Sequence, residues 1–165
     1  MDSNNKLYNF TLIKYEQTSF YISEAPSKSN LKIFNDQLKK HEIKHIVRLC
    51  DPTYDEIDLI TDVKLHDLIF ADGDQPPLDI IVNWLKLLKL NEGPILIHCM
   101  AGLGRAPTIL AIGLIELKMD PFEAVKLIRY KRPGSINSNQ LNFIINYKPT
   151  NKKTNIFYKL FNYLQ

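Results

Sequence analysis

Cysteine is scarce in this sequence, and its two residues, Cys50 and Cys99, are too few for a disulfide-stapled scaffold or a cysteine-rich zinc module. Long apolar runs are also missing: the longest, from Thr108 to Leu117, is interrupted by Glu116 and is too short to cross a bilayer. The first residues contain no uninterrupted apolar stretch of the kind that marks a signal peptide. These absences predict a cytoplasmic protein whose thiols are free.

Neither sign of charge is in large excess, because 21 Lys and Arg residues against 18 Asp and Glu residues give a net charge of +3. An excess this small gives no reason to expect nucleic acid as a partner. The apolar fraction of 45% is sufficient for a buried core, and 165 residues are typical of one domain. Arginine is rare while Lys, Asn and Ile are abundant, which is typical of AT-rich coding genomes such as those of some viruses and protists.

Segments with strand-like and helix-like patterns alternate along the chain. Short runs rich in β-branched and apolar residues predict strands at Phe10–Tyr15, Ser19–Ser23, His45–Cys50, Val63–Leu65 and Pro94–His98. The first two are joined by Glu16-Gln17-Thr18 as a hairpin. Helical spacing predicts helices at Pro26–His41, Pro77–Leu88, Pro107–Leu117, Pro121–Tyr130 and Ser138–Tyr147. Strands interleaved with helices imply an α/β fold whose mostly parallel central sheet is flanked by helices on both faces.

The most informative motif is His98-Cys99-Met100-Ala101-Gly102-Leu103-Gly104-Arg105, which lies between an apolar strand and an apolar helix. Glycines let successive backbone N–H groups turn inward as a nest for an anion, and the positive end of the following helix adds to it. This environment favours a thiolate at Cys99, and Arg105 has the geometry to grip two phosphoryl oxygens. Residues 100–105 are therefore the candidate phosphate-binding loop, and the motif predicts attack by Cys99 on a phosphate ester. The alternative is a buried cysteine in an ordinary glycine-containing turn.

The sequence HCMAGLGRAP contains the HCX5R signature of Cys-dependent protein tyrosine phosphatases, and it resembles more narrowly the phosphatases of regenerating liver, the PRL family. Three further segments are similar to PRL segments at corresponding places: VRLCDPTYD, the FADG loop followed by two prolines, and IRYKRPGSINSNQL. The resemblance covers about Tyr8 to Pro149. It implies a single compact phosphatase domain of the dual-specificity type over residues 1–149, with a phosphocysteine mechanism and neither cofactor nor metal.

The resemblance also assigns a general acid on a mobile loop. Asp72 occupies the position of the PRL acid, and such an acid typically contributes about 10²–10⁴-fold to the rate. Asp74 is the nearby alternative, and Asp72-Gly73 is in addition a common turn dipeptide. The family usually has a second acidic residue before the acid, where this chain has Ala71.

Two residues next to the predicted chemistry have open interpretations. His98 is either a supporting residue that forms hydrogen bonds within the loop or a histidine satisfied in the core. Cys50 ends one predicted strand as Cys99 ends another, so parallel neighbours would place both thiols at one sheet edge. In PRLs this pair forms a reversible disulfide, which the match VRLCDPTYD transfers to Cys50. The alternative for Cys50 is a small buried apolar residue.

Ala106 follows the arginine directly, where many tyrosine phosphatases have a Ser or Thr that stabilises the departing thiolate. PRLs also have alanine here, so we expect hydrolysis of the phosphocysteine, and hence turnover, to be slow. Thr108 is the nearest alternative hydroxyl, and its place along the helix predicts that it points elsewhere.

The C-terminal residues 150–165 depart from the PRL pattern, because no cysteine follows Cys99 and a prenylated CaaX box is therefore absent. Apolar residues in this extension have helical spacing, namely Ile156, Phe157, Leu160, Phe161 and Leu164. This pattern predicts an amphipathic helix that packs on the domain or makes a weak contact with a membrane surface or a partner. No lipid anchor is expected.

Substrate and partner remain open at the level of sequence. A phosphoprotein of the phosphotyrosine type is the expected substrate, and a phosphoinositide or an RNA 5′-phosphate is the alternative within the same chemistry. PRLs also bind CNNM-type magnesium transport mediators through the active-site face, so a binding module that occupies such a partner is the competing class of function. The sequence leaves a homo-oligomer open.

Overall fold

The computed structural model describes residues 9–59 and 62–150, and its centre is a five-stranded sheet with the order β1-β2-β5-β3-β4. The strands are β1 (Thr11–Tyr15), β2 (Thr18–Glu24), β3 (His45–Arg48), β4 (Lys64–Asp67) and β5 (Ile95–Cys99). Only β1 and β2 pair antiparallel, and the other neighbours are parallel. The predicted mostly parallel sheet is therefore confirmed, and the strand that ends at Cys99 lies in its middle.

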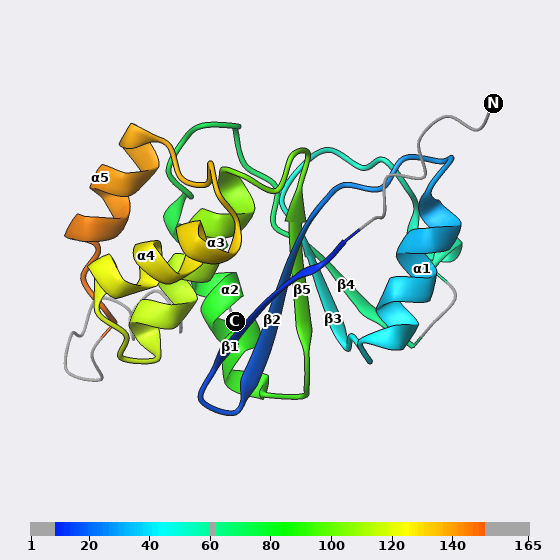
Figure 1. Ribbon diagram of the computed structural model, residues 1–165, viewed down its shortest axis with the longest axis horizontal. Coiled ribbons are helices and arrows are strands. Elements are labelled where there is room, and N and C mark those ends of the chain that lie inside the picture. Colours follow the sequence, from blue (N-terminus) through cyan, green and yellow to red (C-terminus); the bar gives the residue numbers. More distant parts are fainter. Residues whose placement is uncertain (1–8, 60–61, 151–165) are drawn as a thin grey trace.

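Helices cover both faces of the sheet, as the α/β pattern predicted (Figure 1). One face is covered by α1 (Leu31–Lys40), and the other by a layer that contains α2 (Leu78–Leu90), α3 (Arg105–Glu116), α4 (Pro121–Lys131) and α5 (Ser138–Asn146). A short 3-10 helix, Glu56–Asp58, lies between β3 and β4. None of the helices in the described ranges has the length and apolar character needed to cross a membrane.

Helix α3 is buried from Arg105 to Ile115, which explains why its sequence is apolar all round. Trp84 of α2 packs on this helix at Gly113, where a Cβ would lie 2.9 Å from the indole ring. A second, smaller core lies under α1 and contains Phe34, Tyr54 and Leu96. The sheet thus separates two apolar layers, and the central strand is fixed from both sides.

Several predicted boundaries move by a few residues. Helix α1 begins at Leu31 and not at Pro26, because the Asn30 side chain accepts a hydrogen bond from Ser27 N and the chain turns there first. Thr18 pairs with Tyr15 inside the sheet, so the hairpin turn is shorter than predicted. Helix α3 begins at Arg105, two residues before Pro107, since proline needs no N–H donor in the first turn.

Candidate active site

The loop after β5, residues 100–104, is held from outside through its backbone carbonyls. The backbone N–H of Ala25 donates to Met100 O at 3.1 Å, and that of Ile136 donates to Leu103 O at 2.8 Å. The Arg132 guanidinium donates to Ala101 O at 3.1 Å and to Gly102 O at 2.6 Å. In a trans peptide the carbonyl and the following N–H point in opposite directions. The N–H groups of residues 101–104 therefore face away from these partners, toward the inner side of the loop, as an anion nest requires.

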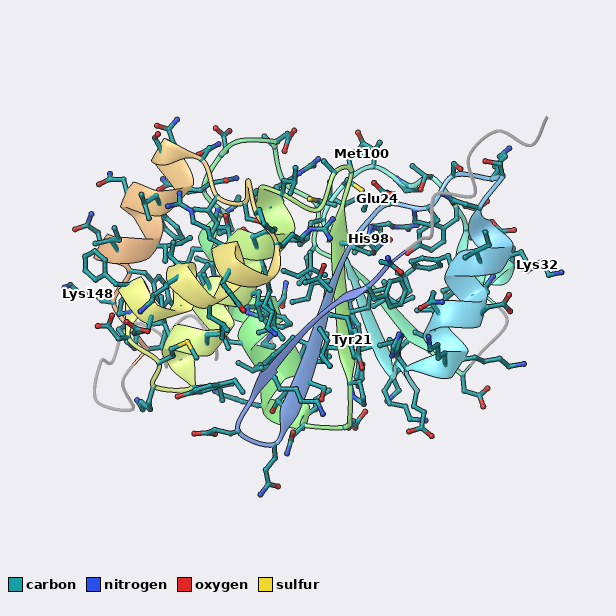
Figure 2. All side chains as sticks on the ribbon, viewed as in Figure 1. Tyr21, Glu24, Lys32, His98, Met100 and Lys148 are labelled. Atoms are coloured by element: carbon teal, nitrogen blue, oxygen red, sulfur yellow. The ribbon has the colours of Figure 1, made fainter. Side chains whose placement is uncertain are left out.

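Gly102 allows this loop to lie against the neighbouring strand. Its φ is +67°, and a Cβ at this position would press on the backbone carbonyl oxygen of Ser23. A side chain is excluded by both the left-handed conformation and the close approach. Figure 2 shows that His98, Met100 and Glu24 lie at the same end of the sheet, where β2 and β5 end.

Arg105 connects three segments around the loop. Its Nη1 donates to the carbonyl oxygens of Leu49 and Phe70, both at 3.0 Å. Its Nε lies 3.2 Å from Asp72 Oδ1 in an ion pair. Because Arg105 is buried and begins α3, its charge adds to the positive end of that helix at the mouth of the nest.

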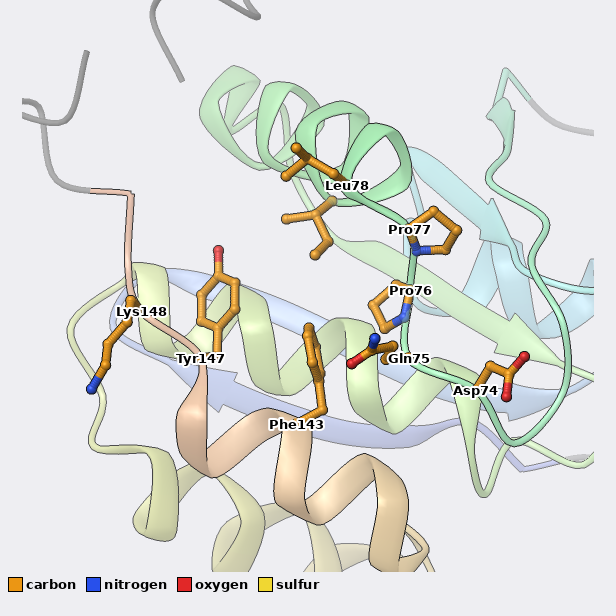
Figure 3. A pocket seen from close by; sticks show the side chains of 9 residues that line it. Asp74, Gln75, Pro76, Pro77, Leu78, Phe143, Tyr147 and Lys148 are labelled. Atoms are coloured by element: carbon orange, nitrogen blue, oxygen red, sulfur yellow. The ribbon is translucent and has the colours of Figure 1, made fainter. Parts of the chain in front are cut away.

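The two candidate acids are in different places. Asp72 contacts Arg105, and its side chain is 75% exposed, so its carboxyl lies at the surface beside the anion site. Asp74 instead lines a groove with residues of α5 (Figure 3). The acid loop is fastened to α5 by the hydrogen bond from Asn137 Nδ2 to Gly73 O, 3.3 Å. The geometry thus brings Asp72, and not Asp74, to the residues of the HCX5R motif.

His98 is fully buried, and its Nε2 lies 2.7 Å from the Tyr54 hydroxyl, which is outside the loop. Burial, followed by the positive charge of Arg48, lowers the pKa of His98 to about 3. The imidazole is therefore neutral at physiological pH and is unsuited to general acid catalysis. Arg48 in turn donates to Tyr54 O at 2.6 Å and forms an ion pair with Asp67, so this network fixes the residue that precedes Cys99.

Cys50 and Cys99 are both free and buried. Cys99 is the last residue of β5, and Cys50 lies two residues after the end of its parallel neighbour β3. Arg48 is opposite His98 in the sheet, and Leu49 N donates to His98 O at 3.0 Å, so the pairing continues to the ends of β3 and β5. Burial raises the pKa of the Cys50 thiol to about 11, although the charge of Arg105 opposes this shift. Cys50 is therefore a neutral thiol at physiological pH.

Three residues of the site had no assigned role in the sequence analysis. Arg132 holds two loop carbonyls, Tyr54 holds His98, and the buried amide of Gln140 packs where a Cβ of Gly104 would be, 3.1 Å from its Nε2. Gln140 also completes the cap of α5, since its side chain accepts from Asn137 N. Arg132 and Gln140 lie in the segment IRYKRPGSINSNQL, which is similar to a PRL segment but has no pattern that predicts these contacts with the loop.

Among residues 9–59 and 62–150, no group of three or more His, Cys, Asp or Glu side chains is arranged to hold a metal ion. The anion nest and Arg105 instead present positive charge and N–H donors, which suit a phosphoryl group.

Comparison with known proteins defines the class first. Residues 25–150 match the family model for the dual specificity phosphatase catalytic domain. A protein tyrosine phosphatase structure from Leishmania major is superimposable with a TM-score of 0.76 and 35% identity, covering 85% of this chain and 99% of that one. The fold and the HCX5R loop are thus those of a Cys-dependent phosphatase.

Two relatives identify the family within this class of phosphatases. The "Probable protein tyrosine phosphatase type IVA A" of Dictyostelium discoideum is 43% identical over 150 residues, which are 87% of this chain and 90% of that protein. The PRL-1 phosphatase of Drosophila melanogaster is 40% identical over 144 residues, which are 84% of this chain and 82% of that protein. The chain therefore belongs to the type IVA, or PRL, family of protein tyrosine phosphatases, as the sequence motifs predicted.

Proposed function

We propose that this chain hydrolyses phosphotyrosine-type phosphomonoesters of proteins through a phosphocysteine on Cys99. The Cys99 thiolate attacks phosphorus, the ester P–O bond breaks, and the leaving oxygen takes a proton from Asp72. Water then attacks the phosphocysteine, Asp72 accepts the proton, and inorganic phosphate and the thiolate are released. The observation that carries the proposal is the position of the Asp72 carboxyl, 3.2 Å from Arg105 Nε and thus beside the loop that joins Cys99 to Arg105.

The acid assignment is tested by comparing Asp72→Asn with Asp74→Asn on two aryl phosphates. A poor leaving group needs the proton and a good one does not. We expect Asp72→Asn to lose about 10²–10³-fold on the poor leaving group and much less on the good one. Asp74→Asn should behave as wild type on both, because Asp74 lies in the groove away from Arg105. Equal losses in the two variants would contradict the assignment.

Turnover should be limited by hydrolysis of the phosphocysteine. Ala106 follows Arg105 in α3, is fully buried and offers no hydroxyl to the departing thiolate. The hydroxyl of Thr108 donates to Gly104 O at 2.9 Å and is therefore engaged within its own helix. We expect Ala106→Ser to raise steady-state turnover while the rate of the first step stays the same. Unchanged turnover in Ala106→Ser would contradict the explanation that the missing hydroxyl makes hydrolysis of the phosphocysteine slow.

We propose further that the two cysteines form a redox switch in the cytoplasm. The Cys99 thiolate attacks one oxygen of hydrogen peroxide, the O–O bond breaks, and the products are a sulfenic acid and hydroxide, which takes a proton from solvent to give water. The Cys50 thiol then condenses with the sulfenic acid, forming the S–S bond and releasing a second water. The support is the position of both thiols at the ends of neighbouring parallel strands. Peroxide inactivation followed by dithiothreitol should restore wild type more completely than Cys50→Ser, and equal recovery would refute the switch.

The competing function is a binding module for a CNNM-type magnesium transport mediator. It is favoured by two apolar side chains on the phosphate loop, since Met100 is 52% and Leu103 is 39% exposed. Ala71 also stands, exposed, where the family usually has an acidic residue. Co-elution with a CNNM cystathionine-β-synthase domain pair, abolished by phosphorylation of Cys99 and by Leu103→Asp, is the expected result. Absence of co-elution at micromolar concentrations would exclude this function for the chain.

A further inference from the structure

A groove lies between the acid loop and α5 and is separate from the phosphate-binding loop (Figure 3). Its volume is about 710 Å³. One wall is formed by Asp74–Leu78, and the other by Phe143 of α5 and by Tyr147 just after that helix, with Lys148 at one end. The lining is mainly apolar, and Leu78 is 43% exposed at the start of α2. Within the described residues nothing fills this groove.

The chain leaves the described structure beside this groove. Lys148 lines it, and two residues later Thr150 donates to Glu116 through both its backbone N and its hydroxyl, each at 2.8 Å. The Tyr147 hydroxyl donates to the same carboxylate at 2.6 Å. Glu116 at the end of α3 thus fixes the point from which residues 151–165 continue, so that segment starts next to the groove.

We propose that residues 151–165 dock in this groove through their apolar stripe of Ile156, Phe157, Leu160, Phe161 and Leu164. Residues 151–155 span up to about 17 Å when extended, enough to turn the chain back from Thr150. A helical stripe from Ile156 to Leu164 would be about 13 Å long.

Docking would act on the acid loop, because that loop is one wall of the groove. The opposite wall, α5, is already joined to the loop by Asn137 Nδ2 and Gly73 O. An apolar segment held between Pro76 and Phe143 would favour the loop position in which Asp72 meets Arg105. The docking does not depend on the role of Asp72, while this consequence rests on the proposed role of Asp72 as the acid.

The test is hydrogen–deuterium exchange on the full chain, followed over residues 73–81 and 143–147. Leu160→Asp places a charge in the stripe, and Asn162→Asp adds the same charge outside it. We expect several-fold faster exchange of both segments in Leu160→Asp and wild-type exchange in Asn162→Asp. Exchange that is unchanged in Leu160→Asp, or accelerated equally in both variants, would overturn the docking.

A substitution in the groove itself provides a second test of the docking. Leu78→Ser should fold, since Leu78 is 43% exposed, and should accelerate the same segments as Leu160→Asp does. If the two side chains meet, the double variant exchanges no faster than either single one, whereas additive effects would contradict contact. Binding of wild type to anionic vesicles that Leu160→Asp abolishes, with exchange unaltered, would assign the stripe to a membrane surface and overturn the proposal. Leaving-group dependence in Asp72→Asn tests the acid separately from these readouts.

Discussion

Gly102→Ala tests how the phosphate-binding loop is held, and Gly134→Ala is its matched control. Both glycines have left-handed backbones, with φ of +67° and +84°. A Cβ at Gly134 meets nothing within 4 Å, whereas at Gly102 it would press on Ser23 O and lie 2.6 Å from Arg132 Nη2. The pair therefore separates the effect of backbone conformation from that of close approach.

The magnitudes follow from these contacts. A left-handed alanine costs about 1–2 kcal/mol, so Gly134→Ala should lose about that much free energy of unfolding. Gly102→Ala carries the same cost and an overpacking term of about 1–3 kcal/mol, because the backbone of Ser23 does not yield as a flexible side chain does. If the loop moves to relieve the contact, its N–H groups lose their positions, and losing one such donor typically costs about 10²–10³ in rate.

The assay is urea unfolding together with single-turnover phosphorylation of Cys99 for wild type and both variants. We expect Gly134→Ala to keep its rate and Gly102→Ala to lose at least about 100-fold. If Gly102→Ala were as active as Gly134→Ala and equally stable, the close approach to Ser23 would not be what holds the loop.

Two further predictions concern the residues behind the loop. Because the pKa of His98 is about 3 in the folded chain and about 6.5 when unfolded, only the unfolded chain takes up a proton between these values. His98 alone should therefore lower the free energy of unfolding by about 1.4 kcal/mol for each pH unit below pH 6.5, and a smaller slope is expected for His98→Gln in urea titrations from pH 7.5 to 5. An identical slope in wild type and in His98→Gln would contradict the low pKa of His98 in the folded chain. Arg132→Met removes donors from Ala101 O and Gly102 O and should weaken vanadate binding at least about tenfold, whereas Lys131→Met, an exposed neighbour, should not. Equal affinities would mean that the loop keeps its shape without Arg132.

Local sequence was sufficient for the elements and for the chemistry of one loop. The run HCMAGLGR specifies strand, turn and helix start within eight residues, so the positions of Cys99 at the end of a strand and of Arg105 at the start of a helix were predictable without tertiary information. The alternation of strands and helices likewise predicted the sheet. Boundaries were less accurate where a side chain competes with the backbone, as Asn30 does before α1.

Contacts between distant segments were not predictable from one sequence. Tyr54 and His98 are 44 residues apart, and Arg132 and Gly102 are 30 apart, and no local pattern connects them. The preference for Asp72 over Asp74 depended on a motif, while the structure adds a reason, the ion pair with Arg105. The groove beside Phe143 is lined by residues near Asp74 and by residues near Phe143, which are distant in sequence, so the sequence alone could not predict it.

The proposed catalysis requires that Cys99 form a phosphocysteine whose hydrolysis limits turnover. Rapid mixing of the fully reduced chain with a fluorogenic aryl phosphate, in parallel with Cys99→Ser, measures both steps at once. We expect a burst of about one equivalent of phenol per chain, followed by a slow phase, with neither phase in Cys99→Ser. A reduced chain that shows no burst and no turnover would contradict covalent catalysis and leave the binding function.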